Sequence, residues 1–245
     1  KQMKLKVFLI ALLAWGFKQV SAADVVWYDG MHPVSYTVEG KKAPVVDIAL
    51  EMFAGDVEQV TGQRAVENKN GIIHIYELDK NPGAVSKLRK LGVPVDDLQT
   101  KLDAFYLSAN DGKIIIAGNN GRGCAYGILE LSRMAGVSPW VWWGDVIPQR
   151  RERLAVNETY STMQAPSVEY RGIFINDEDW SLRNWAWKHY DPTDQFGAMG
   201  PKTYKAIFQL LLRLRANAIW PAMHPGTPGF FTIEGNNEMA DSCGI

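Results

Sequence analysis

Apolar residues recur along the chain at spacings that predict an α/β protein. From Val45 to Val60 they return every three or four positions, which indicates an amphipathic helix, and Gly62 marks its end. Asn110-Asp111-Gly112 lies between two β-branched runs and predicts a hairpin. Apolar runs predict strands near residues 25–27, 34–38, 72–76, 105–107, 114–117 and 153–156. For residues 23–165 we therefore expect a mixed α/β sandwich domain, with one sheet that the last strand rejoins and helices on one side.

Two segments of this region could carry either structure or function. The glycine-rich residues 118–123 precede a helix expected over residues 125–135. They lack the Lys-Ser/Thr of a phosphate-binding loop and the spacing of a dinucleotide motif, so we interpret them as a tight strand-to-helix turn. Residues 138–143 alternate Trp and Val and predict a strand or extended edge. Their Trp side chains either pack at a domain interface or form one wall of a sugar cleft.

After a linker at residues 165–167, the pattern predicts the beginning of a second domain. We expect a fully buried strand at Ile173-Phe174-Ile175, a long aromatic loop over 180–199 and a helix that begins at Gly200-Pro201. The apolar stripe of that helix runs to Leu214. Asn217 is expected as its left-handed end, before a strand at 218–223, a loop at 224–228 and the approach to a third strand at 241–245.

The order strand, loop, helix and strand is the beginning of a (β/α) repeat. A complete eight-fold barrel needs about 250 residues, so we expect residues 166–245 to be the first units of a truncated (β/α)8 barrel. An incomplete barrel exposes apolar strand edges. The part beyond residue 166 is therefore expected to aggregate or to stay poorly folded alone, and the fragment is expected to be inactive.

The first 22 residues have the pattern of a secretory signal peptide. Lysines precede an apolar run from Val7 to Phe17, and Val20-Ser21-Ala22 supplies small residues for cleavage. The run is too short to anchor a protein stably across a bilayer. We therefore expect export to the periplasm or the extracellular space.

Charge and composition limit the classes of partner and cofactor that the chain is expected to bind. With a formal charge of −1 the chain has neither strong basicity nor an acidic tail, so nucleic acid and anionic membranes are not expected as partners. Cys124 and Cys243 are far apart in sequence and form neither a disulfide framework nor a metal motif. The four His residues are scattered as well, so no metal and no cofactor is expected.

The candidate chemistry lies where the apolar run at 173–175 ends. Asn176, Asp177, Glu178 and Asp179 follow it directly, and Trp180 comes next. In parallel α/β folds, ligands bind at the carboxyl ends of strands. The functional interpretation is a sugar or metal site at a strand end, because an aromatic ring beside carboxylates suits a sugar. The structural interpretation is a solvated acidic loop that caps the next element.

Several segments together resemble glycoside hydrolase family 115, the xylan α-1,2-glucuronidases. They are residues 171–180, 199–204, 210–217 and 219–226 in the second part of the chain, and residues 121–131 and 138–145 in the first. The resemblance covers residues 24–245 and implies an exported bacterial enzyme, with an α/β domain that precedes a (β/α)8 barrel. It further implies exo-acting removal of glucuronic acid or 4-O-methylglucuronic acid side chains from xylan, with inversion.

The resemblance assigns Asn176 and Asp177 to the active site, as ligands of sugar hydroxyls or in water activation. We take Asp177 and Glu178 as the catalytic candidates, and Asn176, Asp179, Trp220 and His224 as substrate-binding candidates. Neighbouring residues of an extended segment point in opposite directions, so the opposing carboxylate is expected beyond residue 245. Trp220 would stack on a sugar or belong to the barrel core. His224 would bind a hydroxyl or the uronate, or would bind nothing.

Two other functions remain open at this stage. A hexosaminidase-like glycosidase pairs a similar α/β domain with a barrel but uses a substrate acetamide. A secreted non-catalytic carbohydrate-binding protein would keep the same domain without chemistry. Under the leading hypothesis the partners are glucuronoxylan or its oligosaccharides, with no nucleic acid, no membrane span and a possible homodimer of the full-length form.

Overall fold

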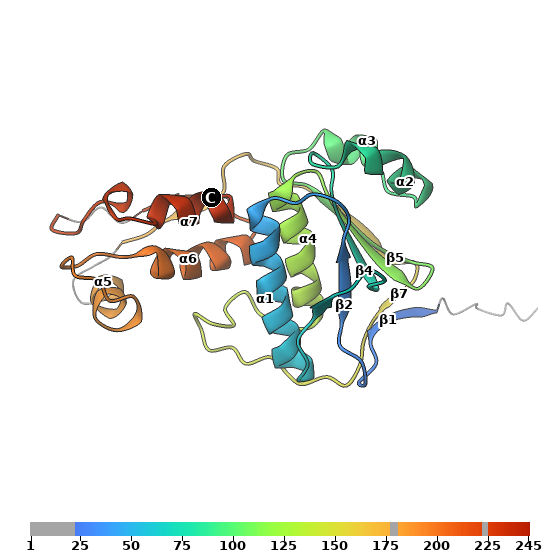
Figure 1. Ribbon diagram of the computed structural model, residues 1–245, viewed down its shortest axis with the longest axis horizontal. Coiled ribbons are helices and arrows are strands. Elements are labelled where there is room, and N and C mark those ends of the chain that lie inside the picture. The colour runs from blue at the N-terminus through green and yellow to red at the C-terminus, as the bar shows by residue number, and fades with distance from the viewer. Residues whose placement is uncertain (1–22, 177–180, 222–224) are drawn as a thin grey trace, which may run out of the picture.

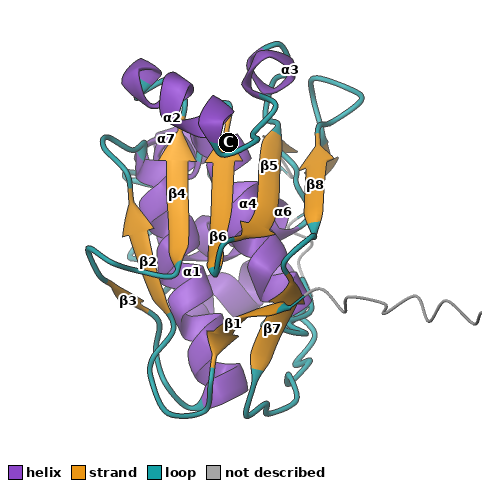
Figure 2. Cartoon of the chain, turned by 90° about the vertical axis from the view of Figure 1, so that its right-hand side faces the viewer, coloured by secondary structure: helices purple, strands orange, loops and turns teal. Residues whose placement is uncertain are grey.

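A six-stranded mixed sheet forms the centre of the first part of the chain (Figure 2). The computed structural model describes residues 23–176, 181–221 and 225–245. The strands follow the spatial order β3-β2-β4-β6-β5-β8, in which β3, β2, β4 and β6 are parallel and β5 is antiparallel to both neighbours. Their bounds are β2 Ser35–Val38, β3 Val66–Glu67, β4 Ile73–Glu77, β5 Phe105–Asn110, β6 Lys113–Gly118 and β8 Ser161–Gln164.

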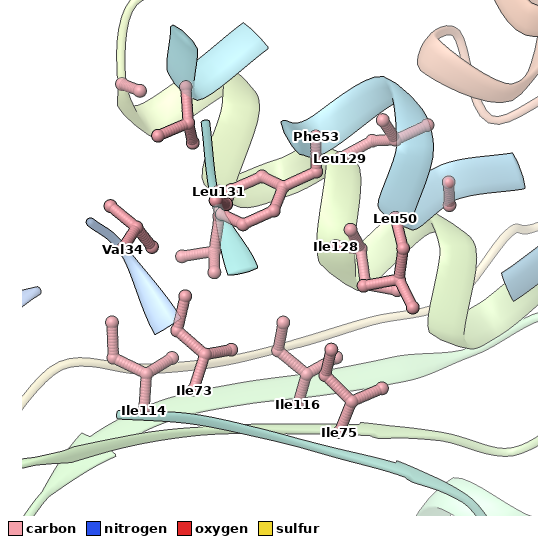
Figure 3. Packing of buried hydrophobic residues seen from close by; sticks show 14 of the residues in the cluster. Val34, Leu50, Phe53, Ile73, Ile75, Ile114, Ile116, Ile128, Leu129 and Leu131 are labelled. Atoms are coloured by element: carbon pink, nitrogen blue, oxygen red, sulfur yellow. The ribbon is translucent and has the colours of Figure 1, made fainter. Parts of the chain in front are cut away.

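Two long helices cover one face of this sheet. They are α1 (Pro44–Thr61) and α4 (Gly121–Met134), which lie side by side (Figure 1). Apolar side chains from both helices meet those of the strands in the main core, shown in Figure 3: Val34, Leu50, Phe53, Ile73, Ile75, Ile114, Ile116, Ile128, Leu129 and Leu131. Helix α1 ends as expected, because Gly62 adopts the left-handed conformation with φ of 86°.

The opposite face also carries helices, so the expectation of helices on one side is wrong. The 3₁₀ turn η1 (Pro82–Ala84) leads into α2 (Val85–Lys90), and α3 (Val95–Gln99) follows. Leu88 and Leu98 from these short helices pack with Tyr76 and Ile115 of the sheet in a second cluster. Alternate residues of β4 and β6 point to opposite faces, and both faces are apolar, so both need cover.

Three further segments differ from expectation. Strand β7 (Leu154–Asn157), which was expected to rejoin the main sheet, pairs with β1 (Asp24–Tyr28) in a separate antiparallel sheet. The strand that rejoins the main sheet is β8, which pairs with β5. Residues 139–144 form turns instead of a strand. Their Trp143 is fixed by a hydrogen bond from its Nε1 to the backbone oxygen of Ala206, 3.1 Å away, which favours the interface interpretation of that side chain.

The glycine-rich stretch is explained by close packing. Helix α4 begins at Gly121, earlier than expected, and the Asn120 side chain accepts a hydrogen bond from the backbone nitrogen of Gly123 as an N-cap. A Cβ at Gly118 would lie 2.2 Å from the backbone nitrogen of Cys124, and one at Gly123 would lie 2.2 Å from the backbone oxygen of Ala104. Glycine is therefore required where the helix approaches the sheet.

The second part of the chain contains one parallel β/α crossover. Strand β9 (Gly172–Phe174) connects through α5 (Leu182–Trp185), the π-helical turn η2 (Ala186–Tyr190) and α6 (Pro201–Arg213) to β10 (Ala218–Trp220), which pairs with β9 in parallel. The 3₁₀ turn η3 (Phe230–Thr232) and helix α7 (Asn236–Cys243) follow, and α7 packs beside α6 (Figure 1).

Several expectations for this part need correction. Residues 182–190 are helical rather than loop, and α7 occupies the place expected for the approach to a third strand. The left-handed residue after α6 is Arg215, with φ of 59°, whereas Asn217 is hydrogen-bonded to Arg171, the residue before β9. Leu214 is exposed, outside the apolar stripe of α6.

Strand β9 is exposed rather than fully buried. Ile173 is 41% and Phe174 53% exposed. Among the described residues β9 pairs only with β10, so its other edge has no neighbouring strand to shield the side chains of Ile173 and Phe174. Cys124 and Cys243 are both buried and free. No helix within the described ranges is long and apolar enough to cross a membrane.

The packing of α6 predicts how residues 166–245 behave in isolation. Leu212 belongs to the core of the first part, and Arg213 pairs with Asp56 of α1. Cutting the chain before residue 166 removes these contacts and leaves β9 and β10 exposed. We expect the isolated piece to show no cooperative thermal transition by circular dichroism and to scatter light, whereas residues 23–165 unfold cooperatively. A sharp transition of the isolated piece without aggregation would contradict this.

The buried carboxyl of Glu77 predicts a pH dependence of stability. Glu77 is 2% exposed, and burial raises its pKa from 4.5 to about 7, although its Oε2 accepts a hydrogen bond from the backbone nitrogen of Ala43. A raised carboxyl pKa means that the folded state holds the proton more tightly than the unfolded chain. This stabilising contribution is fully present below pH 4.5 and is lost as the pH rises to about 7.

Glu77→Gln should remove this part of the pH dependence. Urea unfolding of both proteins between pH 4.5 and about 7 measures this effect. As the pH rises, the unfolding free energy of the variant minus that of the wild type is expected to increase by on the order of 1–3 kcal/mol. Parallel stability curves for wild type and variant would show that Glu77 does not titrate in this interval.

Candidate active site at the ends of strands β9 and β10

The carboxyl ends of β9 and β10 lie side by side. Ile219 is paired with Ile173 and Trp220 with Phe174, and the backbone nitrogen of Ile175 donates to the backbone oxygen of Trp220 at 3.0 Å. The parallel pairing brings the residues that follow both strands to one edge. The register pairs Gly172 with Ala218, so segments that are 46 positions apart in sequence meet at this edge.

Asn176 lies two residues beyond the end of β9 and is exposed. The structure therefore places Asn176 and Trp220 at the same edge of the two strands. Asp177, Glu178 and Asp179, and also His224, lie outside the described residues, so their predicted roles stay predictions.

Trp220 presents an accessible aromatic ring. Its side chain is 62% exposed and contacts the ring of Phe174 edge to face, with 5.9 Å between ring centroids and 86° between planes. In the described chain it is thus not a buried core residue. An indole with one edge supported and its surface open to solvent is suited to stack against the apolar face of a sugar ring.

The inner face of the two strands packs on α6. Ile175 and Ile219 are partly buried against a cluster that includes Met199, Tyr204 and Phe208. Alternation along each strand therefore separates a supported face from an open face that carries Phe174 and Trp220. The cluster fixes the strands as a platform beneath the candidate site.

A cap and a buried cation organise the segments beside this platform. Oδ2 of Asp191 accepts from the backbone nitrogen of Thr203 at 2.9 Å, which satisfies a free amide in the first turn of α6. Arg183 is buried, and its Nη1 donates to Oγ1 of Thr227 at 3.3 Å. Arg183 thus links the segment after β9 to the loop after β10. Sequence analysis missed it because a single Arg within a loop-like stretch carries no spacing signal.

An aromatic cluster joins the turn at 139–144 to α5 and η2. The Trp185 and Tyr190 rings stack at 4.7 Å with 11° between planes, and Trp142 contacts both. Burial raises the pKa of Tyr190, with a further contribution from Asp191. Lys202 lies 4.3 Å from the Tyr190 ring centroid, a cation–π distance. Trp142 and Trp143 thus contact α5 and η2 at a junction between the two parts of the chain.

The described residues contain no cluster of three or more His, Cys, Asp or Glu side chains that could hold a metal ion. What this edge offers instead is an exposed amide, an exposed indole and the predicted carboxylates of the following segment. Such a set can bind hydroxyl groups and a sugar ring.

Comparisons with known proteins identify the family. Residues 163–245 match the model of glycosyl hydrolase family 115. A solved family GH115 4-O-methyl-α-glucuronidase, described as specific for decorated arabinogalactans, is 44% identical over 90% of this chain, with a TM-score of 0.82. The chain covers 29% of the length of that protein. No curated protein matches the chain.

A more distant likeness concerns the fold alone. A chitobiase of Flavobacterium johnsoniae is 11% identical, with a TM-score of 0.50, and the match covers 91% of this chain and 31% of that one. At this identity the match carries no information on substrate. The match to the family model and the 44% identity over most of the chain agree with the family suggested by the sequence motifs. The chain belongs to glycosyl hydrolase family 115.

Proposed function

We propose that the full-length protein that contains this chain is an exo-acting α-glucuronidase. It removes glucuronic acid or 4-O-methylglucuronic acid from the side chains of a plant polysaccharide. The observation that carries this proposal is the 44% identity, over 90% of the chain, to a 4-O-methyl-α-glucuronidase. The exposed Asn176 and Trp220 at one edge of β9 and β10 support it, because they supply a polar ligand and a stacking surface.

The proposed organisation follows from the same family. Residues 1–22 are a signal peptide, residues 23–165 form the α/β domain, and residues 166–245 begin a (β/α)8 barrel. The crossover from β9 through α6 to β10 supports the barrel assignment, because parallel strands joined by a helix are its repeating unit. The protein would be exported. The piece spanning residues 1–245 alone would be inactive, and a homodimer and the lack of a nucleic-acid partner stay predictions.

The proposed mechanism is hydrolysis with inversion. One carboxyl group protonates the leaving oxygen and a second activates water, at a separation of roughly 6.5–9.5 Å. Asp177 and Glu178 are the candidates on this chain. Because they are adjacent in sequence, they cannot readily flank both sides of one bond, so the second group would come from another barrel strand. Asn176, Asp179 and His224 would bind hydroxyls or the uronate, while Trp220 stacks on the ring.

The identity of the polysaccharide is a separate question, because the sequence motifs suggest xylan and the similar solved enzyme is specific for decorated arabinogalactans. Purified full-length protein should be incubated with glucuronoxylan and with glucuronic-acid-decorated arabinogalactan in parallel. We expect free glucuronic or 4-O-methylglucuronic acid from at least one of them, with the β-anomer formed first in the proton NMR spectrum if inversion holds.

Other products would favour the alternatives. Release of N-acetylglucosamine from chito-oligosaccharides, without uronic acid from either polysaccharide, would favour a hexosaminidase-like enzyme. Polysaccharide binding without any released sugar would favour a non-catalytic carbohydrate-binding protein. Either result would overturn the proposal.

A further inference from the structure

A single buried carboxylate connects the two parts of the chain. Asp103 lies two residues before β5, its side chain is fully buried, and its φ of 54° is unusual for a residue with a side chain. Its Oδ1 accepts from Nδ2 of Asn120 and Nε of Arg122, both at 2.9 Å. Its Oδ2 accepts from Nη2 of Arg171 at 2.7 Å and Nδ2 of Asn217 at 3.1 Å. Each carboxylate oxygen thus accepts one hydrogen bond from an amide and one from a guanidinium.

These four donors come from two different places. Asn120 and Arg122 begin α4 in the first part of the chain, whereas Arg171 precedes β9 and Asn217 precedes β10. Through Oδ2 alone, Asp103 therefore binds the two residues that precede the strands of the candidate site. Burial, the largest influence, raises the pKa of Asp103, but Arg171, Asn120 and Arg122 outweigh it and hold the pKa below its ordinary value.

Arg171 and Asn217, which precede β9 and β10, are also hydrogen-bonded to each other. Oδ1 of Asn217 accepts from the backbone nitrogen of Arg171 at 2.9 Å, and the backbone oxygen of Arg171 accepts from the backbone nitrogens of Asn217 and Ala218. The Arg171 guanidinium donates further to the backbone oxygens of Glu169 and Arg215 at 2.7 and 2.8 Å. The beginnings of β9 and β10 thus form one hydrogen-bonded unit that rests on Asp103.

We propose that Asp103 is a positioning residue that sets the register and direction of β9 and β10, and thereby the location of Asn176 and Trp220. Only four residues separate Arg171 from Asn176, and two separate Asn217 from Trp220. A β-strand rises about 3.3 Å per residue, so these strands are short. A shift of their first residues is therefore passed on to their last residues. The consequence for turnover rests on the proposed function, because a misplacement of about 1 Å in a catalytic site can cost about 100-fold in rate.

Other ion pairs at the same junction serve as a comparison. Asp56 of α1 is 2% exposed and accepts from Nη1 and Nη2 of Arg213 at 2.7 and 2.8 Å. This pair is as buried and as well bonded as that of Asp103 and Arg171, but it holds the end of helix α6 instead of a strand start. Asp56→Asn is therefore a matched control, since it removes a buried charge at the junction without touching Arg171 or Asn217.

The test compares Asp103→Asn with Asp56→Asn in the full-length protein, under conditions where circular dichroism shows both to be folded. Hydrogen exchange of the segments 171–176 and 217–221 reports strand position without requiring activity. We expect Asp103→Asn to accelerate exchange about 10-fold or more in both segments and to lower kcat about 10- to 100-fold. KM and the pH profile should change little. Asp56→Asn should leave kcat and both segments near wild type.

If Asp103→Asn does not fold, Asn217→Ala decides, because it keeps the buried Asp103 paired with Arg171. It should accelerate exchange of the Ile175 amide, which is bonded to Trp220.

Equal exchange and equal kcat in Asp103→Asn and Asp56→Asn would overturn the positioning role, as would unchanged exchange in Asn217→Ala. A wild-type protein that releases no uronic acid would instead refute the proposed function. In that case the hydrogen-exchange comparison still decides whether Asp103 positions the two strands.

Discussion

Asp177→Ala in the full-length protein is expected to lower kcat on its glucuronic-acid-bearing substrate more than about 100-fold. A group that transfers a proton in the transition state contributes about 10²- to 10⁴-fold, and its removal leaves no side chain to replace it. The loss should fall on kcat more than on KM, because proton transfer belongs to the transition state and not to ground-state binding. Released uronic acid, measured over a range of substrate concentrations, gives both constants.

A matched control uses a carboxylate at the other end of β9. Glu169 is exposed and precedes the strand, and only its backbone oxygen takes part in the contacts of Arg171 and Asn217. Glu169→Gln removes one negative charge near the same strand and should change kcat less than about twofold. Near-normal turnover of Asp177→Ala would remove Asp177 from the catalytic residues and leave Glu178 as the candidate on this chain.

Phe53→Ala is expected to destabilise residues 23–165 by about 3–5 kcal/mol. Phe53 is 1% exposed on α1, stacks on Trp27 at 6.3 Å and lies in the main core above the sheet (Figure 3). Truncation to alanine loses the transfer free energy of the ring and leaves a cavity that surrounding residues fill only in part. Urea unfolding, followed by circular dichroism, measures the difference in midpoint and in unfolding free energy.

Ile147→Ala is the control for this substitution. Ile147 is 87% exposed, so truncation of this apolar side chain to alanine should cost less than about 1 kcal/mol. Similar losses in both variants would mean that the packing between α1 and the sheet is not the main source of stability. An unchanged midpoint in Phe53→Ala would contradict the core described above.

The sequence was most informative where apolar periodicity extends over several turns. Helices α1 and α6 and the hairpin of β5 and β6 follow directly from the pattern, because each combines a long apolar stripe or a specific turn with a clear end signal. The family, too, could be recognised from short motifs. These features are local, and local interactions suffice to determine them.

Features that depend on tertiary neighbours could not be predicted. Strand β8 consists of Ser-Thr-Met-Gln and has little apolar character, so only its pairing with β5 defines it. Helix α7 begins after Gly235 with a polar sequence, and its packing on α6 makes it a helix rather than a strand. The exposure of Ile173 and Phe174 depends equally on which elements cover β9.

The candidate site was predictable in part. The polar residues that follow the apolar run at 173–175 indicated Asn176 and the carboxylates after it. In the structure, the parallel pairing of β9 with β10 brings Asn176 and Trp220 to one edge. Nothing in the sequence indicated Asp103, because its partners Arg171 and Asn217 lie 68 and 114 positions away. A buried network of this kind becomes visible only when the two parts of the chain are packed together.

The most direct test of the account is a crystal structure of the full-length protein with glucuronic acid or its 4-O-methyl form bound. We expect the sugar at the carboxyl ends of β9 and β10, with Asn176 or Asp177 within hydrogen-bonding distance of a hydroxyl or of the anomeric oxygen and Trp220 against the ring. A uronic acid bound elsewhere, with Asn176 and Asp177 turned away from it, would contradict the central claim.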